Sequence, residues 1–155
     1  MIERTMPIDR MENIISVFGS FDQNLRIIES ELRVSVTDRD DQLRIAGEAE
    51  DVMAAEKAIN GLLQLASRGG AQNVRYILKL VSEGRESKIG ELGGDVVCIT
   101  AKGKPIKAKT LGQKAYVDAM NKNTITLGIG PAGTGKTYLA VAEAVSAFRS
   151  EQVNR

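Results

Sequence analysis

The sequence has no histidine, no tryptophan and one cysteine, Cys98, among its 155 residues. Without histidine, the chain cannot hold a Ser-His or Cys-His catalytic pair or a zinc site built on His/Cys clusters. A single cysteine cannot form an internal disulfide, which fits a reducing compartment. Aromatic residues make up only 4% of the chain, so a core has to be built mainly from aliphatic side chains.

Long apolar runs are also missing. No stretch approaches the roughly 20 apolar residues that cross a bilayer, and the first residues mix both charge signs and lack the apolar segment of an export signal. We therefore expect a cytoplasmic protein with no membrane segment. Apolar residues (43%) and charged residues (26%) are present in amounts that are ordinary for globular domains.

The net charge of +1 hides an asymmetry between the two halves of the chain. Residues 1–66 carry seven basic and 13 acidic side chains, a net charge of −6. Residues 67–155 carry 14 basic and seven acidic side chains, a net charge of +7. A polyanion would therefore be attracted to the second half.

The first part of the chain predicts the element order β-α-β-β-α. Residues 14–18 form a short apolar run with strand character, and Asp22 is placed to cap the helix that follows. Residues 33–38 and 42–46 alternate between apolar and polar side chains on either side of a turn, which predicts a hairpin. A stripe of apolar residues at helical spacing then marks residues 49–66.

A linker-like Ser-Arg-Gly-Gly sequence at residues 67–70 separates this part from the rest. Beyond it we expect an amphipathic helix over 72–82, a strand over 95–100 and a helix over 113–120. A basic, loop-like stretch lies between the last two, and its lysines are Lys102, Lys104, Lys107 and Lys109.

One motif carries recognisable chemistry. Residues 130–137 match G-x-x-x-x-G-K-[ST] at every fixed position. An apolar run over 124–129 comes directly before the motif and predicts a strand, and an apolar helix is expected after it, over 136–148. The motif consists of Gly130, Pro131, Ala132, Gly133, Thr134, Gly135, Lys136 and Thr137.

This motif predicts a site for ATP or a related nucleoside triphosphate with Mg²⁺. Small residues let the backbone curl so that several N–H groups point into one concavity that suits a phosphate. The following helix adds its positive N-terminal end. We expect Lys136 to contact the β- and γ-phosphates as the catalytic residue and the Thr137 hydroxyl to bind Mg²⁺.

Hydrolysis needs more than this loop. A carboxylate at the end of a neighbouring strand and a group that orients water are also required. The acids after Thr137 are Glu143, within the expected helix, and Glu151, and neither follows a predicted strand. Since the 26 residues from Gly130 onward are too few for a doubly wound sheet, we expect the chain to be the N-terminal piece of a longer protein. Hydrolysis by this chain alone is therefore not expected.

The stretches KTLGQKAYVDAM (109–120) and NTITLGIGPAGTGKTYLAVAEAV (123–145) resemble the start of the ATPase domain of PhoH-like proteins. These are cytosolic bacterial ATPases related to superfamily-1 helicases. The resemblance implies that Gln113 reads the adenine edge, for which an amide offers both a donor and an acceptor. It also implies a RecA-like nucleoside triphosphate hydrolase fold and a role in RNA metabolism.

Residues 24–59 resemble a KH domain, a module that holds single-stranded RNA through a GXXG loop. The corresponding sequence here is Gly19-Ser20-Phe21-Asp22. Its aspartate would repel a phosphate, and the surrounding charge is negative. We therefore expect any contact with single-stranded RNA to fall instead to the four lysines of the basic stretch.

Together these observations predict an α/β chain in three parts. A KH-like α+β module spans 12–66, a helical and basic connecting segment spans 67–109, and an incomplete P-loop ATPase domain spans 110–155. The expected function is ATP binding within a PhoH-like ATPase. The alternative is a non-enzymatic RNA- or protein-binding module with a vestigial P-loop.

Overall fold

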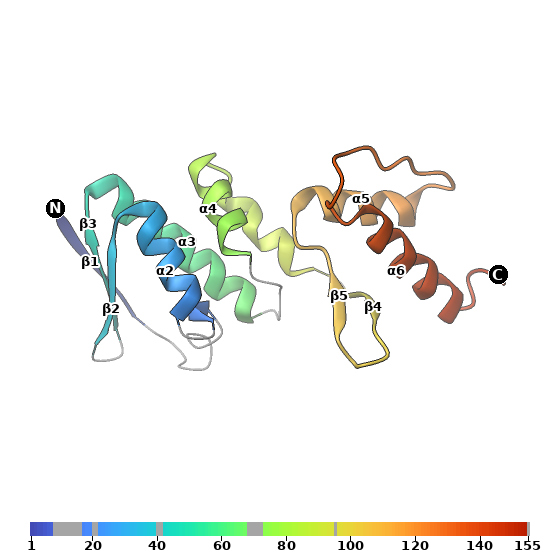
Figure 1. Cartoon of the computed structure of the whole chain (residues 1–155), viewed down its shortest axis with the longest axis horizontal. Coiled ribbons are helices and arrows are strands. Elements are labelled where there is room, and N and C mark those ends of the chain that lie inside the picture. The colour runs from blue at the N-terminus through green and yellow to red at the C-terminus, as the bar shows by residue number, and fades with distance from the viewer. Residues whose placement is uncertain (8–16, 20–21, 40–41, 68–72, 95, 155) are drawn as a thin grey trace. The chain divides into compact units, whose positions relative to one another are not determined.

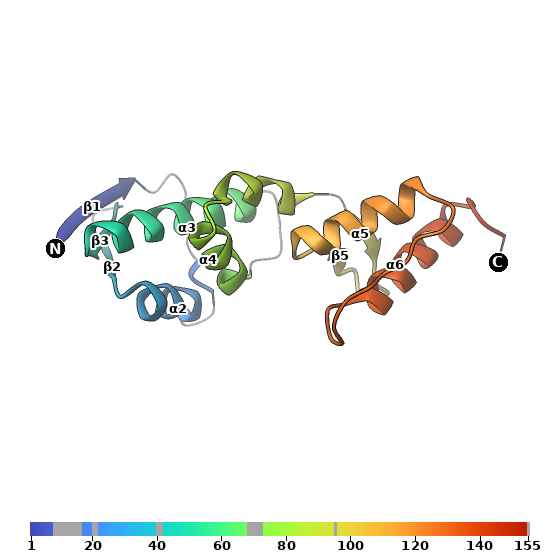
Figure 2. The same ribbon diagram turned by 90° about the horizontal axis from the view of Figure 1, so that it is seen from above.

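The computed structural model describes residues 1–7, 17–19, 22–39, 42–67, 73–94 and 96–154. They form two compact units, Met1–Gly93 and Gly94–Arg155, whose elements are labelled in Figures 1 and 2. Each unit combines helices with a small antiparallel sheet, so the chain has a mixed α/β fold. In the described residues, no helix is both long and apolar enough to span a membrane.

The first unit is built on the sheet of β1 (Ile2–Pro7), β2 (Ser35–Arg39) and β3 (Gln42–Gly47), in the order β1-β3-β2 with antiparallel pairs. The β2–β3 hairpin confirms the sequence prediction, and Val36 lies opposite Ile45 across it. The apolar side chains of this alternating pattern are all buried: Val34, Val36, Leu43 and Ile45. Strand β1 was not predicted, because most of its side chains are exposed and give no alternating pattern.

Two helices cover this sheet. Helix α3 (Ala49–Ser67) packs against β1 and β3, and α2 (Gln23–Leu32) packs against β2 and α3 (Figure 1). The apolar stripe predicted for α3 is confirmed, since Val52, Ile59 and Leu62 have no exposed surface. These side chains form the centre of the first unit.

The entry into α2 differs from the sequence prediction. Val17 and Phe18 are helical and buried, not extended; residues 14–16 of the expected strand lie outside the described residues. A short apolar run fits a buried helix as well as a strand, which is why its pattern was misleading. Asp22 adopts a left-handed φ of 57° and makes no side-chain cap. Asn24 stabilises this turn instead, as its Nδ2 donates to Val17 O at 2.7 Å.

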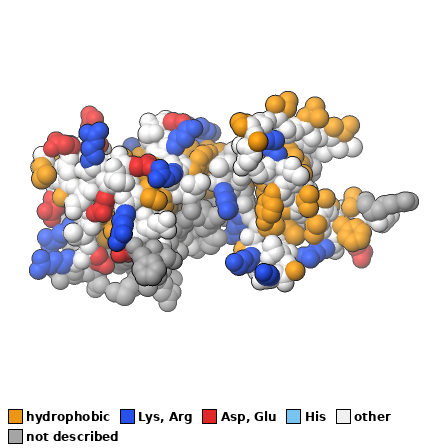
Figure 3. Space-filling model, viewed as in Figure 1, with side chains coloured by type: hydrophobic (Ala, Val, Ile, Leu, Met, Phe, Trp, Pro, Cys, Tyr) orange, Lys and Arg blue, Asp and Glu red, His pale blue; other side chains and the backbone are white. Residues whose placement is uncertain are grey.

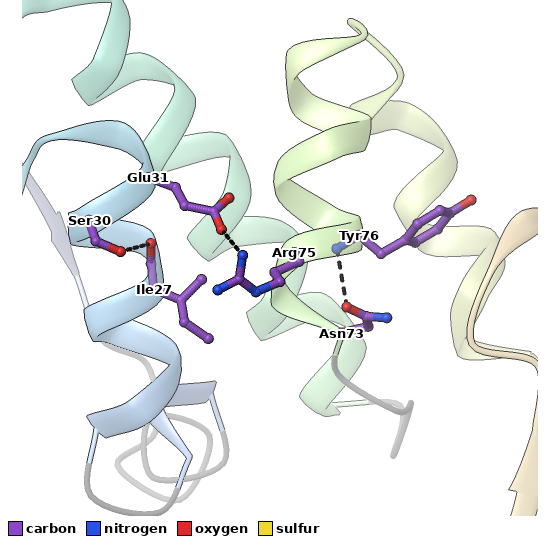
Figure 4. A network of polar contacts seen from close by, with 6 residues as sticks. All are labelled: Ile27, Ser30, Glu31, Asn73, Arg75 and Tyr76. Atoms are coloured by element: carbon purple, nitrogen blue, oxygen red, sulfur yellow. Dashed lines mark hydrogen bonds and ion pairs between the residues drawn. The ribbon is translucent and has the colours of Figure 1, made fainter. Parts of the chain in front are cut away.

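Helix α4 (Val74–Ser82) confirms the predicted amphipathic helix, with its apolar side chains buried against α2 and α3. Figure 4 shows how its first turn is fixed. The Asn73 side chain accepts from the Tyr76 N–H at 3.2 Å and caps the helix. Arg75 Nη1 lies 2.6 Å from Glu31 Oε1 and links α4 to α2.

The 3₁₀ helix η2 (Glu86–Gly93) closes the first unit by packing on α3. The approach is close, because a Cβ added at Gly61 would lie 2.7 Å from Ile89 Cδ1. At the rim, Lys57 Nζ donates to Glu86 Oε1 at 2.6 Å. This hydrogen bond lowers the pKa of Glu86 below its usual value.

The second unit contains the hairpin of β4 (Val96–Ile99) and β5 (Pro105–Lys107) and the helices α5 (Leu111–Lys122) and α6 (Lys136–Arg149). Helix α6 packs against both β4 and α5, and Arg149 Nη1 donates to Ile99 O at 2.9 Å. Segment 67–109 thus contributes α4 and η2 to the first unit and both hairpin strands to the second.

One expected strand does not form. Residues 124–129 precede the phosphate-binding motif, but they are not assigned to a strand, and no described strand pairs with them. Their sequence has the apolar character of a strand, yet ladder hydrogen bonds require a neighbouring strand. This segment lies against α5 instead: Thr126 Oγ1 donates to the backbone carbonyl of Ala119 at 3.1 Å.

Candidate functional site

The motif at 130–137 forms a curled loop that leads directly into α6, which begins at Lys136. Gly133 and Gly135 have φ values of 76° and 84°, in the left-handed region that glycine adopts without strain. The loop therefore requires glycine at these positions. The N-terminal end of the 14-residue helix α6, which carries a partial positive charge, follows this loop directly.

The ammonium group of Lys136 lies within the curl of this loop. Its Nζ donates to Gly130 O at 2.8 Å, to Pro131 O at 2.5 Å and to Thr134 Oγ1 at 3.1 Å. The Thr134 hydroxyl in turn donates to Pro131 O at 3.0 Å. A positive charge is thus held beside the concavity by neutral oxygens, which an anionic ligand can replace.

Gln113 connects the first turn of α5 to the same loop. Its Oε1 accepts from the Lys109 N–H at 2.7 Å, and its Nε2 donates to Thr134 O at 3.1 Å. The close approach depends on Gly135, where an added Cβ would lie 3.1 Å from Gln113 Nε2. The structure therefore brings Gln113 together with the motif, 21 residues further along the chain.

Thr110 positions Gln113, and the sequence reasoning missed it. The Thr110 hydroxyl caps α5 by accepting from the Gln113 N–H at 3.1 Å. Thr110-x-x-Gln113 is the capping-box pattern, in which the fourth side chain reaches back to the residues before the helix. That pattern was the available signal, and here the glutamine reaches the N–H of Lys109.

A cavity of about 490 Å³ lies beside the loop, within the second unit. This volume is in the range of small-molecule sites. Its walls include Gln113, Tyr116, Gly128, Pro131 and Lys136. The Tyr116 ring closes on Gly128, where an added Cβ would lie 3.0 Å from Cε2. The cavity thus has an aromatic and apolar part next to an amide and an ammonium group.

Thr137, the expected Mg²⁺ ligand, is exposed in the first turn of α6. Its hydroxyl suits magnesium, which prefers oxygen ligands and keeps several waters. In the described part of the chain, no group of three or more acidic, cysteine or histidine side chains is placed to hold a metal. Glu143 lies two turns along α6, with its Oε2 buried and without a hydrogen-bond partner among described residues.

Three of the four lysines of the basic stretch lie in the β4–β5 hairpin, and the fourth, Lys109, follows it. Lys102 and Lys104 are exposed at the turn, Lys107 is half-buried in β5, and Lys109 is exposed before α5. Figure 3 shows Lys and Arg side chains gathered over the lower part of the second unit. In the first unit, Gly19 and Asp22 frame the GXXG-like loop with left-handed φ values; Ser20 and Phe21 lie outside the described residues.

Comparison with known proteins matches the region that contains this site. A family profile described as "PhoH: PhoH-like protein" matches residues 105–155. A PhoH-like protein of Mycobacterium tuberculosis is 42% identical over 146 residues, which are 92% of this chain and 41% of that protein. PhoH-like proteins of Bacillus subtilis and Synechocystis are 33% and 29% identical, over 93% and 97% of this chain and 46% and 47% of their own lengths.

The chain therefore spans less than half the length of each of these curated relatives. No solved structure matches it. The resemblance seen in the residues around the motif is confirmed by relatives that align with nearly the whole chain. With the curled loop, Lys136 and Gln113 in one place, these matches assign the chain to the PhoH-like protein family.

Proposed function

We propose that this chain binds ATP together with Mg²⁺ at the loop 130–137. The observation that carries the proposal is the Lys136 ammonium group, which lies inside the curl of the loop on three oxygens. The β- and γ-phosphates would replace these neutral oxygens with anionic ones, so the ammonium group would gain a direct charge–charge attraction to its hydrogen-bond acceptors. Thr137 would ligate Mg²⁺ through its hydroxyl.

The adenine base would enter the 490 Å³ cavity. There the Gln113 amide would offer a donor and an acceptor to the edge of the base, after it gives up its bonds to Lys109 N and Thr134 O. The Tyr116 ring would face the base from α5. This arrangement explains why Gln113 and the phosphate loop lie together although the intervening chain is long.

In this proposal the segment 110–155 is the first strand–loop–helix unit of a RecA-like ATPase domain. Hydrolysis belongs to the complete domain, because a carboxylate at a strand end and a water-orienting group must be added. Lys136 would then stabilise charge on the transferred phosphoryl group. Residues 12–66 would form the KH-like module, joined through 67–109.

Calorimetric titration of the 155-residue chain with ATP, with and without Mg²⁺, tests the binding proposal. We expect Lys136→Ala to weaken ATP binding by about 10- to 100-fold, the effect of losing charge-assisted hydrogen bonds worth ~1.5–3 kcal/mol. Lys122→Ala is the matched control: it removes a lysine that is exposed at the end of α5.

If wild-type protein produces no heat with ATP, or if Lys136→Ala binds as well as Lys122→Ala, the loop does not bind ATP. The alternative then applies, in which the chain is a non-enzymatic RNA- or protein-binding module with a vestigial loop. An ATP affinity that does not depend on Mg²⁺ would contradict only the assignment of Thr137 as the Mg²⁺ ligand, not ATP binding at the loop.

We propose as a second function that the β4–β5 hairpin contacts the backbone of single-stranded RNA. The exposed Lys102 and Lys104 at its turn and Lys109 at its base support this, and Lys107 lies between them. In the first unit, the exposed Asp22 carboxylate would weaken any phosphate contact at the GXXG-like loop. ATP-driven work on RNA by the whole protein would combine the two proposed functions.

RNA binding measured against salt concentration tests this second function. Each lost phosphate contact should reduce the slope of log K against log [salt] by about 0.7. The double variant Lys102→Gln/Lys104→Gln should therefore lower the slope by about 1.4, whereas the exposed pair Lys88→Gln/Lys122→Gln should leave it unchanged. Equal slopes for both variants would refute the hairpin contact.

A further inference from the structure

Strand β1 forms one edge of the sheet in the first unit, and β2 forms the other. The sheet order is β1-β3-β2, so each outer strand has a neighbouring strand on one side only. Figure 2 shows β1 along the margin of the first unit. An edge strand presents backbone N–H and C=O groups that can pair with a further strand, and natural sheets block most of their edges for this reason.

The β2 edge is blocked by a side chain of α2. Glu29 Oε1 accepts from the Val36 N–H at 2.9 Å, so this N–H points away from β3 although Val36 lies directly opposite Ile45. Opposite residues of an antiparallel pair alternate between hydrogen-bonded and non-hydrogen-bonded pairs. Val36 and Ile45 therefore form a non-hydrogen-bonded pair, and the backbone groups of Ile45 point to β1.

This alternation determines which backbone groups of β1 point outward. Arg4 lies opposite Ile45, so its N–H and C=O point to β3. The backbone groups of Glu3 and Thr5 then point away from the sheet, and no strand in the described ranges pairs with them. Pro7 is the next outward-pointing residue and has no N–H to donate. The free edge of β1 therefore consists of Glu3 and Thr5.

Exposed apolar side chains lie beside this free edge, on the side of the sheet that α3 covers. Arg4 faces α3, because its Nη1 lies 2.6 Å from Glu56 Oε2. Ile2 lies on the same face of β1 as Arg4 and is 39% exposed. Met53 precedes Glu56 by one helical turn and is 43% exposed. A second strand that carries its own helix would cover both apolar side chains.

A second copy of this chain fits the free edge of β1. Two-fold interfaces bring the same surface of both copies together, and an axis at Arg4 places Glu3 of one copy opposite Thr5 of the other. Each such pair can exchange two backbone hydrogen bonds. An axis at Glu3 would place two carboxylates opposite each other, which is unfavourable. An axis at Thr5 would place Glu3 opposite Pro7, which cannot donate.

We propose that two copies of the chain associate by antiparallel pairing of their β1 strands, with Arg4 at the two-fold axis. The two sheets become one continuous sheet with both α3 helices on the same face, where Ile2 and Met53 lose exposed surface. The two Arg4 side chains meet at the axis, and the ion pair of each with Glu56 of its own copy offsets their repulsion. This association uses only the first unit and does not depend on ATP binding.

Sedimentation velocity of the 155-residue chain tests the proposal between about 1 µM and about 1 mM, the range in which small interfaces dissociate. We expect the mass to rise from one copy to two. Amide exchange of Glu3 and Thr5 should slow by at least about tenfold across this range, because strand pairing protects N–H groups. Exchange of Arg4 and Met6 should not depend on concentration, since their N–H groups already bond to β3.

Proline variants locate the contact at the backbone. Thr5→Pro removes an outward N–H and leaves the bonds between β1 and β3 in place, as proline is tolerated at this position of an edge strand. It should raise the dimer Kd by at least about tenfold. Asp38→Pro is the matched control, because Asp38 lies two residues after Val36 on β2 and its N–H also points outward. Circular dichroism checks that both variants are folded.

A side-chain variant tests the same interface without a change of backbone. Met53→Glu should also raise the dimer Kd by at least about tenfold, because a carboxylate would be covered without a partner. Val141→Glu is the matched control, since Val141 is an exposed apolar residue on a helix of the second unit. Lys136→Ala should form dimers like the wild type even if ATP binding is lost.

Three results would overturn the proposal. One is a mass of one copy over the whole concentration range. Another is a dimer in which Glu3 and Thr5 exchange as fast as in the dilute chain. The third is a dimer that Val141→Glu or Asp38→Pro weakens as much as Met53→Glu or Thr5→Pro does, which would place the contact away from β1.

Discussion

At the residue scale, one side-chain amide has two roles: the Gln113 amide holds the loop in this structure, and it is the group proposed to read the base. Its oxygen and nitrogen are both engaged, with Lys109 N and Thr134 O. The same two atoms are the ones that would read an adenine edge. Gln113 therefore links α5 to the loop in this structure, and in the proposed function it would exchange these bonds when a base enters.

The variant Gln113→Glu distinguishes the amide's donor from its acceptor. Glutamate can still accept from Lys109 N, but it cannot donate to Thr134 O and it adds a negative charge beside the phosphate loop. We expect ATP binding to weaken by about tenfold or more, because a neutral hydrogen bond of ~0.5–1.5 kcal/mol is lost and the new carboxylate repels the phosphates. Gln152→Glu is the control, because it makes the same charge change at an exposed position of the second unit.

Isothermal titration with ATP and GTP measures the effect. If Gln113→Glu and Gln152→Glu bind ATP equally, then Gln113 contributes neither to the base nor to the loop. If Gln113→Glu weakens ATP and GTP to the same extent, Gln113 positions the loop but does not select the base. A larger loss for ATP supports reading of adenine.

The loop residues could be predicted from sequence because their constraint is local. The left-handed backbone at Gly133 and Gly135 requires glycine at both positions. The lysine and threonine follow at fixed spacing, so the sequence pattern itself indicates the loop conformation. Thr110 and Gly128 could be recognised only in part. The signal for Thr110 is its local capping-box spacing to Gln113. The role of Gly128 depends on its contact with the Tyr116 ring of α5, which no local pattern reveals.

At the scale of elements, apolar periodicity predicted the helices and strands whose own residues show it. The β2–β3 hairpin, α3 and α4 all show the apolar spacing of their structure in the sequence. Strand β1 does not, because it lies at the edge of its sheet and only Met6 of its six residues is buried. Residues 124–129 show the opposite case: the strand signal is present, but its realisation depends on a neighbouring strand.

The contact between α3 and η2 gives a prediction at this scale. Alanine is favoured over glycine in a helix by about 1 kcal/mol. At Gly61, however, the new Cβ would lie 2.7 Å from Ile89 Cδ1 and 3.1 Å from its Cγ2, and Ile89 is itself buried. Overpacking of this kind costs ~1–3 kcal/mol. Gly61→Ala should therefore reduce the free energy of unfolding by up to about 2 kcal/mol.

Ile89→Val removes the Cδ1 atom that the new Cβ would meet, and so provides a matched background for Gly61→Ala. In that background Gly61→Ala should become neutral or stabilising, although Ile89→Val alone costs ~0.5–1.5 kcal/mol. Urea unfolding of the four proteins of this double-mutant cycle measures the coupling. Equal effects of Gly61→Ala in both backgrounds would mean that η2 does not pack on α3 as described.

At the scale of the whole molecule, the two units differ in how much core they contain. The largest fully buried side chains all belong to the first unit: Ile28, Leu43, Ile45, Ile59, Leu62, Leu65, Ile77, Leu80, Ile89, Val17 and Val52. In the described part of the second unit, the buried apolar residues are Val97, Leu139 and Ala142, each with some exposed surface. Full burial of a large apolar side chain contributes ~1.5–3 kcal/mol. The second unit should therefore have the smaller free energy of unfolding.

Unfolding of the 155-residue chain should therefore occur in two transitions, with the second unit unfolding first. Amide exchange provides the assignment, because α6 should exchange at lower denaturant concentration than α3. ATP with Mg²⁺ at 100 times its Kd should raise the free energy of unfolding of the second unit by ~2.7 kcal/mol and leave that of the first unit unchanged, since the proposed site lies wholly in the second unit. Lys136→Ala should remove this shift, measured as the difference between the transitions of the same variant with and without nucleotide. A single transition, with α3 and α6 losing protection together, would show instead that the two units unfold cooperatively. In that case the shallow core of the second unit would not set its stability.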